Sequence, residues 1–376
     1  MLYRTYGKTN EKVSILGFGL MRLPLDENNK INRYKAGELI DYARSRGVNY
    51  LDTAYPYHNS ESEEFLGEYL KLRNCRDEVF IATKLPSYLI KTKEDMYKYF
   101  NEQLEKLQLD YVDFYLVHTL NKEYFENLKS LGIFDFLDEL KNQGKVKHIG
   151  FSFHDKLEVF KEIVDSYNWE FCQIQYNFLD VEYQAGLEGL KYASDKGLGV
   201  AIMEPLRGGR LALNVPKDIA ELWNSSSVQR TPAQWAFKYL WDDEKITVVL
   251  SGMNDFNHVK MNIDTADTAT PNSLSLEEKD LIEKVRQKYL SKLKVDCTSC
   301  KYCMPCPAGV NIPKSFDYLN NASLYDDVEG FKENYKKFFK EEEKPDNCVK
   351  CGKCEKLCPQ HISIRSALEE TKNLFS

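Results

Sequence analysis

The chain has 376 residues, of which 43% are hydrophobic and 29% charged, and a formal net charge of −7. It is long enough for two or three average domains, or for one large barrel and a small module. The acidic balance argues against a nucleic-acid partner and against binding to a membrane surface, because both usually require a basic face. Residues 1–14 lack the apolar stretch of a secretion signal and no apolar run is long enough to span a membrane, so we expect a cytoplasmic protein.

Short apolar segments alternate with amphipathic ones along the first 265 residues or so. The apolar segments are rich in β-branched or aromatic residues and lack a polar face, as expected for strands of a buried parallel sheet. We expect these strands at residues 15–19, 47–52, 79–84, 111–117, 146–151, 172–176, 198–203 and 246–250. The helical patterns between them cover residues 35–46, 60–71, 93–107, 155–167, 186–196 and 231–240.

Eight β/α units of this combined length predict an α/β fold of the (β/α)8 TIM-barrel type. A doubly wound sheet is the competing arrangement, and it usually carries G-x-G-x-x-G after its first strand. The corresponding segment, Gly17-Phe-Gly-Leu-Met-Arg22, lacks the third glycine, and no Walker motif occurs in the chain. The sequence therefore favours the barrel.

The chain is predicted to divide into three parts. Residues 1–270 form the barrel, residues 271–294 a polar linking helix, and residues 295–376 a small, mainly helical module. Ser275 and Glu278 have the spacing of a capping box at the start of the linking helix. The module has few large aliphatic side chains outside residues 310–340, so we expect it to have little apolar core of its own.

Ionisable residues follow three successive strands of the predicted barrel. They are Asp52 and Tyr57 after the second strand, Lys84 after the third and His118 after the fourth. Each alone has a purely structural explanation, such as a strand cap or a satisfied core histidine. Because active sites of TIM barrels lie at the carboxyl ends of the strands, the four are expected to converge at one mouth.

These motifs resemble those of the aldo/keto reductase family. The resemblance rests on D-T-A-x-x-Y after strand 2, T-K after strand 3 and L-V-H after strand 4. It extends over about residues 3–266 through G-K-V-K-H-I-G-F-S, Q-I-Q-Y-N and P-L-R-G-G. It implies that Tyr57 is the general acid, that Lys84 and Asp52 tune it, and that His118 orients a carbonyl substrate. A buried ammonium beside Tyr57 would lower the phenol pKa from about 10, and a carboxylate would keep that ammonium charged.

The same resemblance implies a site for NADPH or NADH across the barrel mouth. Its contacts would come from Ser152 and Gln173 at the nicotinamide carboxamide, from the 205–209 loop at the pyrophosphate, and from the chain after the last strand at the adenosine. Met203 replaces the aromatic ring that many members stack on the nicotinamide. Gly252 and His258 replace the lysine and arginine that bind a 2′-phosphate, so the preference for NADPH is weakened. The full set of predicted contacts is Ser152, Gln173, Met203, Pro205, Leu206, Gly208, Ser251, Gly252, Asn254 and Asn262.

Eight of the ten cysteines lie in two dense runs near the end of the chain. Such crowding, next to nearly 300 residues that contain only Cys75 and Cys172, indicates metal ligation and not a disulfide scaffold. The second run, C-x2-C-x2-C-x3-C-P, has the spacing of a bacterial ferredoxin, and the first differs only in its last interval. Zinc is the alternative, since C-x2-C pairs also build tetrahedral zinc sites. The repeated x2 spacing, the following proline and the lack of histidine within the runs favour iron.

The resemblance to two-cluster ferredoxins implies two [4Fe–4S] clusters that exchange their fourth ligand between the runs. Cluster one would be bound by Cys297, Cys300, Cys303 and Cys358, and cluster two by Cys348, Cys351, Cys354 and Cys306.

The predicted function is an oxidoreductase that moves hydride between nicotinamide and a small carbonyl or alcohol substrate. Nicotinamide exchanges two electrons whereas each cluster passes one, and the sequence shows no recognisable flavin motif to connect them. The clusters would therefore serve electron transfer, for instance to a redox partner protein, or redox sensing. Two alternatives remain open: an electron-transfer protein that couples nicotinamide or flavin to the clusters, and a non-catalytic redox sensor.

Overall fold

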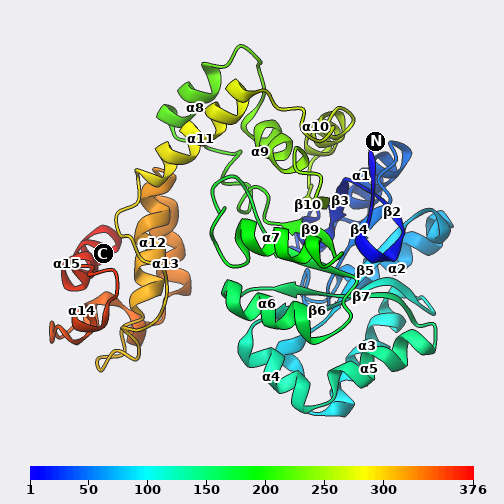
Figure 1. Cartoon of the computed structure of the whole chain (residues 1–376), viewed down its shortest axis with the longest axis horizontal. Coiled ribbons are helices and arrows are strands. Elements are labelled where there is room, and N and C mark those ends of the chain that lie inside the picture. Colours follow the sequence, from blue (N-terminus) through cyan, green and yellow to red (C-terminus); the bar gives the residue numbers. More distant parts are fainter. The chain divides into compact units, whose positions relative to one another are not determined.

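The computed structural model describes residues 1–376, and its centre is a closed barrel of eight parallel strands (Figure 1). Each strand pairs with its sequence neighbours, and the last, β10, closes onto the first, β3. The predicted TIM barrel is confirmed, and the doubly wound alternative is excluded because the sheet has no edge. The strands are β3 (Leu16–Gly19), β4 (Tyr50–Asp52), β5 (Phe80–Leu85), β6 (Val112–Leu120), β7 (Val146–Phe153), β8 (Phe171–Gln175), β9 (Gly199–Met203) and β10 (Ile246–Gly252).

Helices follow the strands and cover the outside of the barrel (Figure 1). Thr231 caps α9 through a capping box with Gln234, in agreement with the predicted Thr-Pro helix start. Further helices at residues 122–142 and 256–266 were not recognised in the sequence. The barrel helices are α1 (Arg33–Ser45), α2 (Ser62–Arg73), α3 (Lys93–Leu107), α4 (Lys122–Ser130), α5 (Ile133–Asn142), α6 (Leu157–Ser166), α7 (Gly186–Asp195), α9 (Pro232–Trp241) and α10 (Phe256–Ala266).

An N-terminal hairpin, which the sequence did not predict, contributes a ring to the barrel core. Its strands are β1 (Tyr3–Thr5) and β2 (Lys12–Ser14). The buried ring of Tyr6, between them, packs at 5.0–5.1 Å against Phe114 and Phe171. A Cβ atom at Gly199 would overlap the Tyr6 ring, so a glycine is required there. The ring fills the barrel interior with apolar volume, as the layered side chains of such barrels do.

By packing, the chain divides into two compact units, and each unit is built from two separate segments of the sequence. The barrel unit contains residues 1–209 and 230–279, and the second unit contains residues 210–229 and 280–376. The stretch 210–229 includes α8 (Lys217–Asn224), where Asp218 forms ion pairs of 3.3 and 3.2 Å with Lys288 and Lys292. The other helices are α11 (Leu276–Leu290), α12 (Ile312–Leu324), α13 (Val328–Phe338), α14 (Lys353–Leu357) and α15 (Ile364–Phe375).

The second unit has a larger apolar core than the sequence suggested. Ile364 and Leu368 of α15 pack with Phe316 and Leu319 of α12 in one buried cluster. The ring of Phe375, also on α15, stacks on Tyr335 at 5.0 Å. The expectation that this module has little apolar core of its own was wrong, because α15, which follows the last cysteine, has an apolar face that packs against α12.

None of the helices is both long and apolar enough to cross a membrane.

Candidate active site and cysteine pockets

The four predicted catalytic side chains belong to the carboxyl ends of three neighbouring strands and to the loop after the first of these. Asp52 is the last residue of β4, Lys84 lies near the end of β5, and His118 lies near the end of β6. Tyr57 follows β4 in a loop whose next three residues, 58–60, all have positive φ. Parallel pairing of β4 with β5 and of β5 with β6 brings these ends to the same mouth.

A buried ion pair forms the base of this site. Lys84 Nζ donates to both carboxylate oxygens of Asp52 at 2.8 Å and to the carbonyl oxygen of Thr53 at 2.7 Å. The Lys84 side chain is fully buried, and Asp52 is almost so. Burial lowers the pKa of Lys84 and raises that of Asp52, and each shift is opposed by the charge of the partner. Because all three ammonium donors have acceptors, the pair can stay ionised without water.

Tyr57 lies between this ion pair and His118. The Lys84 ammonium is 5.1 Å from the centroid of the Tyr57 ring, and the Tyr57 and His118 rings meet edge to face at 6.3 Å. Burial, followed by the negative charges of Asp52 and Glu204, raises the pKa of the Tyr57 phenol well above its usual value. The sequence had led us to expect a lowered pKa. The direction differs because the Lys84 donors are directed to Asp52 and Thr53, and the ammonium lies over the ring.

His118 sits at an irregularity of β6. The register between β6 and β7 shifts between Val117 and Leu120, and Thr119 has a φ of +52°, which is rare for a β-branched residue. Such bulges occur next to active sites, where they redirect a side chain. Burial, and then the charge of Lys84, lowers the pKa of His118 well below its usual value, so the imidazole is neutral. Its Nδ1 atom is buried and has no hydrogen-bond partner.

A second buried carboxyl group, which the sequence analysis missed, supports Lys84 from the side of α2. Glu63 Oε1 accepts hydrogen bonds of 2.6 Å from Thr83 Oγ1 and from Gln103 Nε2. Gln103 also donates to the carbonyl oxygen of Lys84 at 3.0 Å. The network therefore bonds the side chain of the residue before the lysine and the carbonyl group of the lysine itself, and it helps to fix the end of β5. The sequence offered only one signal, an acidic residue at the start of a helix.

The residues predicted to hold the nicotinamide carboxamide lie next to one another at the ends of β7, β8 and β9. Ser152 pairs with Gln173 in register, and Ser152 Oγ accepts from the Thr119 amide at 2.7 Å. Gln173 is buried and donates only to the sulfur of Met203, at 3.5 Å, while its Oε1 atom has no partner. The Gln173 amide therefore has one N–H without an acceptor and an oxygen without a donor. A ligand carboxamide can supply both partners.

The other predicted cofactor contacts form two segments of the barrel unit. Gly208 and Gly209 have positive φ values of 69° and 94° and close the loop that contains Pro205 and Leu206. Ser251, at the end of β10, accepts from Asn262 Nδ2 of α10 at 3.1 Å, and both are buried, whereas Gly252 and Asn254 are exposed. Without side chains, the two glycines leave the backbone of the loop open to a phosphate group.

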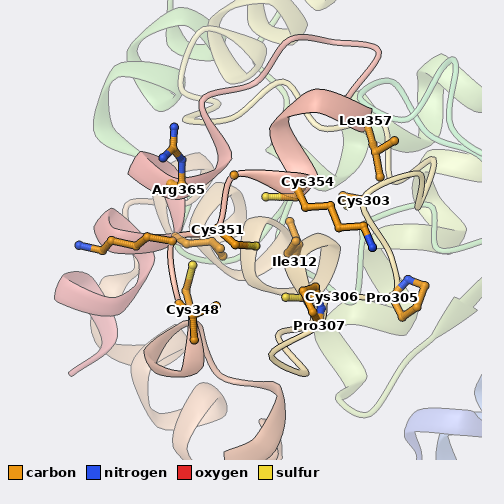
Figure 2. A pocket seen from close by; sticks show the side chains of 15 residues that line it. Cys303, Pro305, Cys306, Pro307, Ile312, Cys348, Cys351, Cys354, Leu357 and Arg365 are labelled. Carbon is orange, nitrogen blue, oxygen red and sulfur yellow. The ribbon is translucent and has the colours of Figure 1, made fainter.

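The eight tail cysteines line two pockets of the second unit. One pocket is lined by Cys297, Cys300, Cys303 and Cys358, and by Ile312, Phe316 and Ile364. The other is lined by Cys306, Cys348, Cys351 and Cys354 (Figure 2), and Cys303 lines both pockets. Cys306 thus lies with the second run and Cys358 with the first, as an exchange of ligands would require, and the two ligand sets stay a prediction. None of these cysteines forms a disulfide, and no group of three or more His, Cys, Asp or Glu side chains is arranged to hold a single metal ion.

The donor chemistry of these pockets fits iron–sulfur clusters. Each offers at least four thiols and an apolar wall, and a cluster of this kind is held by four cysteines. Burial raises the pKa of the Cys297 and Cys354 thiols, and it raises that of Cys303 to about 11. These free thiols would therefore need a bound metal to become thiolates near neutral pH.

A model of the aldo/keto reductase family matches residues 15–283. The chain belongs to this family. A second family model, a 4Fe-4S dicluster domain, matches residues 296–362 and contains all eight tail cysteines. The chain is therefore an aldo/keto reductase with a dicluster domain after its barrel.

Individual relatives agree with this assignment. The L-galactose dehydrogenase of Arabidopsis thaliana is 28% identical over 307 residues, which cover 74% of this chain and 92% of that protein. A probable aryl-alcohol dehydrogenase of Saccharomyces cerevisiae, AAD4, is 33% identical over 136 residues, 32% of this chain and 40% of the relative. The solved aldo-keto reductase AKR11C1 from Bacillus halodurans, in its holo form, superposes with a TM-score of 0.64 at 28% identity, covering 76% of this chain and 96% of that one.

Proposed function

We propose that this aldo/keto reductase transfers hydride between a nicotinamide nucleotide and a small carbonyl or alcohol substrate. The observation that carries the proposal is the polar mouth of the barrel. There, a phenol and a neutral imidazole with a free nitrogen lie above a buried ion pair, next to an amide whose oxygen is unsatisfied. Buried polar atoms without partners are rare in proteins and indicate that a ligand completes the site.

When bound, a reduced nicotinamide would supply the hydride that converts a carbonyl carbon into an alkoxide. Tyr57 gives the phenolic proton to this alkoxide, which is a far stronger base than a phenolate. Its raised pKa keeps Tyr57 protonated and ready to donate at neutral pH. The charge of Lys84 then stabilises the tyrosinate that remains, and Asp52 keeps Lys84 charged. In the oxidative direction the same steps occur in reverse order, and the Tyr57 tyrosinate accepts the proton of the alcohol.

His118 is the second group that acts on the substrate. A neutral imidazole can donate one N–H to the carbonyl oxygen, where negative charge grows during reduction. Donors of this kind contribute about 2.7–4 kcal/mol of transition-state stabilisation in water-excluded sites. The bulge at Thr119 fixes the direction of the ring before the substrate arrives.

The residues that would hold the nucleotide are Ser152, Gln173 and Met203 at the nicotinamide, Pro205, Leu206 and Gly208 at the pyrophosphate, and Ser251, Gly252, Asn254 and Asn262 at the adenosine. No basic side chain replaces the usual pair at Gly252 and His258, so NADH is expected to bind about as well as NADPH, or better.

For the second unit we propose two [4Fe–4S] clusters, bound by the cysteine sets that line the two pockets. Cys351 is exposed, so the cluster that it would bind lies near the surface, where a partner could exchange single electrons. Electron transfer to such a partner and redox sensing are the two roles that this position supports.

The test is anaerobic purification with iron and sulfide analysis, followed by a panel of aldehydes, ketones and hydroxylated substrates with NADH and NADPH. Turnover of any carbonyl that is lost in Tyr57→Phe supports the reductase. Reduction of the clusters by NADH alone, seen as bleaching of their visible absorption, would instead favour an electron-transfer protein. A cofactor that binds without any turnover of the panel and without cluster reduction would favour a sensor.

A further inference from the structure

Arg22 lies against both predicted phosphate-side segments of the cofactor site, although the motifs give it no role. It is the last residue of the short 3-10 helix that follows β3, and its side chain is exposed. The alkyl part of the side chain crosses Gly252, where an added Cβ atom would lie 3.0 Å from Arg22 Cβ and 3.2 Å from its Cγ and Cδ. Its guanidinium reaches Gly208, where an added Cβ atom would lie 3.2 Å from Arg22 Nη2.

The two glycines make this course possible. A side chain at position 252 would occupy the space that the Arg22 stem fills, so the basic residue that other members carry there is incompatible with Arg22 as it lies. At position 208, φ is +69° and there is no Cβ atom to separate the guanidinium from the loop backbone. The cation therefore comes from the short helix after the first barrel strand, and it faces the 205–209 loop.

The guanidinium is free to bind an anion, because it makes no hydrogen bond or ion pair with the protein. The nearest acidic group at this point is Glu204, whose Oε2 atom would lie 3.9 Å from the same added Cβ atom on Gly208. A planar guanidinium with several unused donors matches the geometry of phosphate oxygens better than any other side chain.

We propose that Arg22 binds the pyrophosphate of the nicotinamide nucleotide and thereby provides affinity that does not depend on the 2′-phosphate. The inference rests on the proposed function and deepens it. Since both nucleotides carry the same pyrophosphate, Arg22 strengthens the binding of NADH and NADPH equally. The structure thus gives a reason why this chain can lack basic residues at Gly252 and His258 and still bind a dianionic cofactor.

The experiment measures dissociation constants of the full-length protein for NADH, NADPH and ADP-ribose by fluorescence titration, with no turnover involved. Arg22→Ala is expected to weaken all three by about ten- to hundredfold, the usual effect of losing charge-assisted hydrogen bonds, and to leave the NADPH-to-NADH ratio unchanged. The matched control is Arg33→Ala, which removes an exposed arginine of α1 that pairs with Glu64 at 3.9 Å. It should change none of the three constants.

A double-mutant cycle tests the packing part of the argument. Gly252→Ala should weaken NADH binding by displacing the Arg22 stem, and it should have little further effect when Arg22 is already alanine. Loss confined to NADPH would move Arg22 to the 2′-phosphate and overturn the proposal. Unchanged constants in Arg22→Ala, or full additivity in the cycle, would overturn it as well. If the wild-type protein itself binds no nicotinamide nucleotide, the proposed function fails before Arg22 is tested.

Discussion

At the scale of single residues, the site combines a proton donor that is hard to ionise with an imidazole that is hard to protonate. Burial drives both effects, raising the pKa of Tyr57 and lowering that of His118. Both groups are therefore uncharged before the reaction, and the charged groups of the site are the buried Lys84 ammonium and Asp52 carboxylate beneath them. In the proposed mechanism Tyr57 would supply a proton, His118 would supply a hydrogen bond, and the positive charge of Lys84 would stabilise the tyrosinate once the proton has left.

The first prediction concerns the proton donor. Tyr57→Phe should lose about 10²–10⁴-fold in carbonyl reduction, because only the phenolic proton is removed and the ring keeps its contacts. NADH affinity, measured by titration, should stay near the wild-type value. Retention of more than about a tenth of wild-type turnover, with chemistry rate-limiting, would assign proton transfer to another group.

A second prediction follows from the two pKa directions. Reduction needs a protonated Tyr57, so it should be lost only as the pH rises through a phenol pKa that lies above its usual value near 10. Neutral His118 gains a proton only below its usual pKa of about 6.5. The rate of the chemical step should therefore be flat from about pH 6.5 to 10, once a deuterium isotope effect shows that this step is rate-limiting. A basic limb with a midpoint near pH 8 would mean that Lys84 reaches the phenol after substrate binds.

At the scale of elements, cysteines of both runs line each pocket: Cys358 of the second run lies with the first run, and Cys303 and Cys306 of the first run lie with the second. In the proposed clusters, three ligands would come from one run and the fourth from the other. The exchange crosses the helical pair α12 and α13, which separates the runs by some 40 residues of chain. With clusters bound, Cys306 and Cys358 would therefore link the two cysteine runs. The apolar side chains of α12 and α15, Phe316 and Leu368 among them, form the wall behind both pockets.

This ligand exchange can be tested with paired substitutions. Cys306→Ser combined with Cys348→Ser should damage one cluster and leave about four irons per chain of the original eight or so. Cys306→Ser combined with Cys300→Ser should damage both. Iron analysis with electron paramagnetic resonance of the reduced protein distinguishes the cases, and Cys75→Ala serves as a control for a thiol outside the tail. The reverse pattern would mean that Cys306 stays with its own run.

The sequence predicted the elements that repeat and missed those that do not. Barrel strands are buried on both faces, so all eight were visible as apolar runs, and their carboxyl ends placed Asp52, Lys84 and His118 together. The hairpin around Tyr6 was missed because its strands are three residues long, too short for a period. Arg22 and the left-handed Thr119 were missed for a different reason: neither a side-chain direction nor a φ value is written in a local pattern.

At the scale of the whole molecule, two units with separate cores share one chain. The proposed clusters would support only the second of them, and within it mainly the cysteine loops, since α12, α13 and α15 pack on apolar and aromatic side chains. The predicted boundaries at residues 270 and 294 remain a prediction. Packing assigns residues 210–229 to the second unit, and no feature of their composition signals this.

A fourth prediction follows for the protein without its metal. Limited proteolysis after anaerobic chelation should cut first within residues 296–311 and 345–363, because ligation energy is the main support of loops of this kind. The thermal transition of the barrel should stay within a few degrees of the holo value. A chelated tail as resistant as the holo form would show that the clusters contribute little to its folding. Early cuts inside α12 would show that its apolar core cannot persist alone.

Because residues 210–229 belong to the second unit, they are synthesised long before the segment with which they pack. On the ribosome, α8 emerges with Ile219 and Trp223, both buried in the finished protein, well before residues 280–376 exist to cover them. The barrel unit has all its residues once position 279 has been synthesised, whereas the second unit also needs α15, nearly 100 residues later. Throughout that interval the nascent protein carries an exposed tryptophan-bearing helix on an otherwise complete enzyme scaffold. A gene truncated after codon 279 would leave α8 permanently uncovered, and its product should bind hydrophobic dyes and chaperones that the full-length protein does not bind.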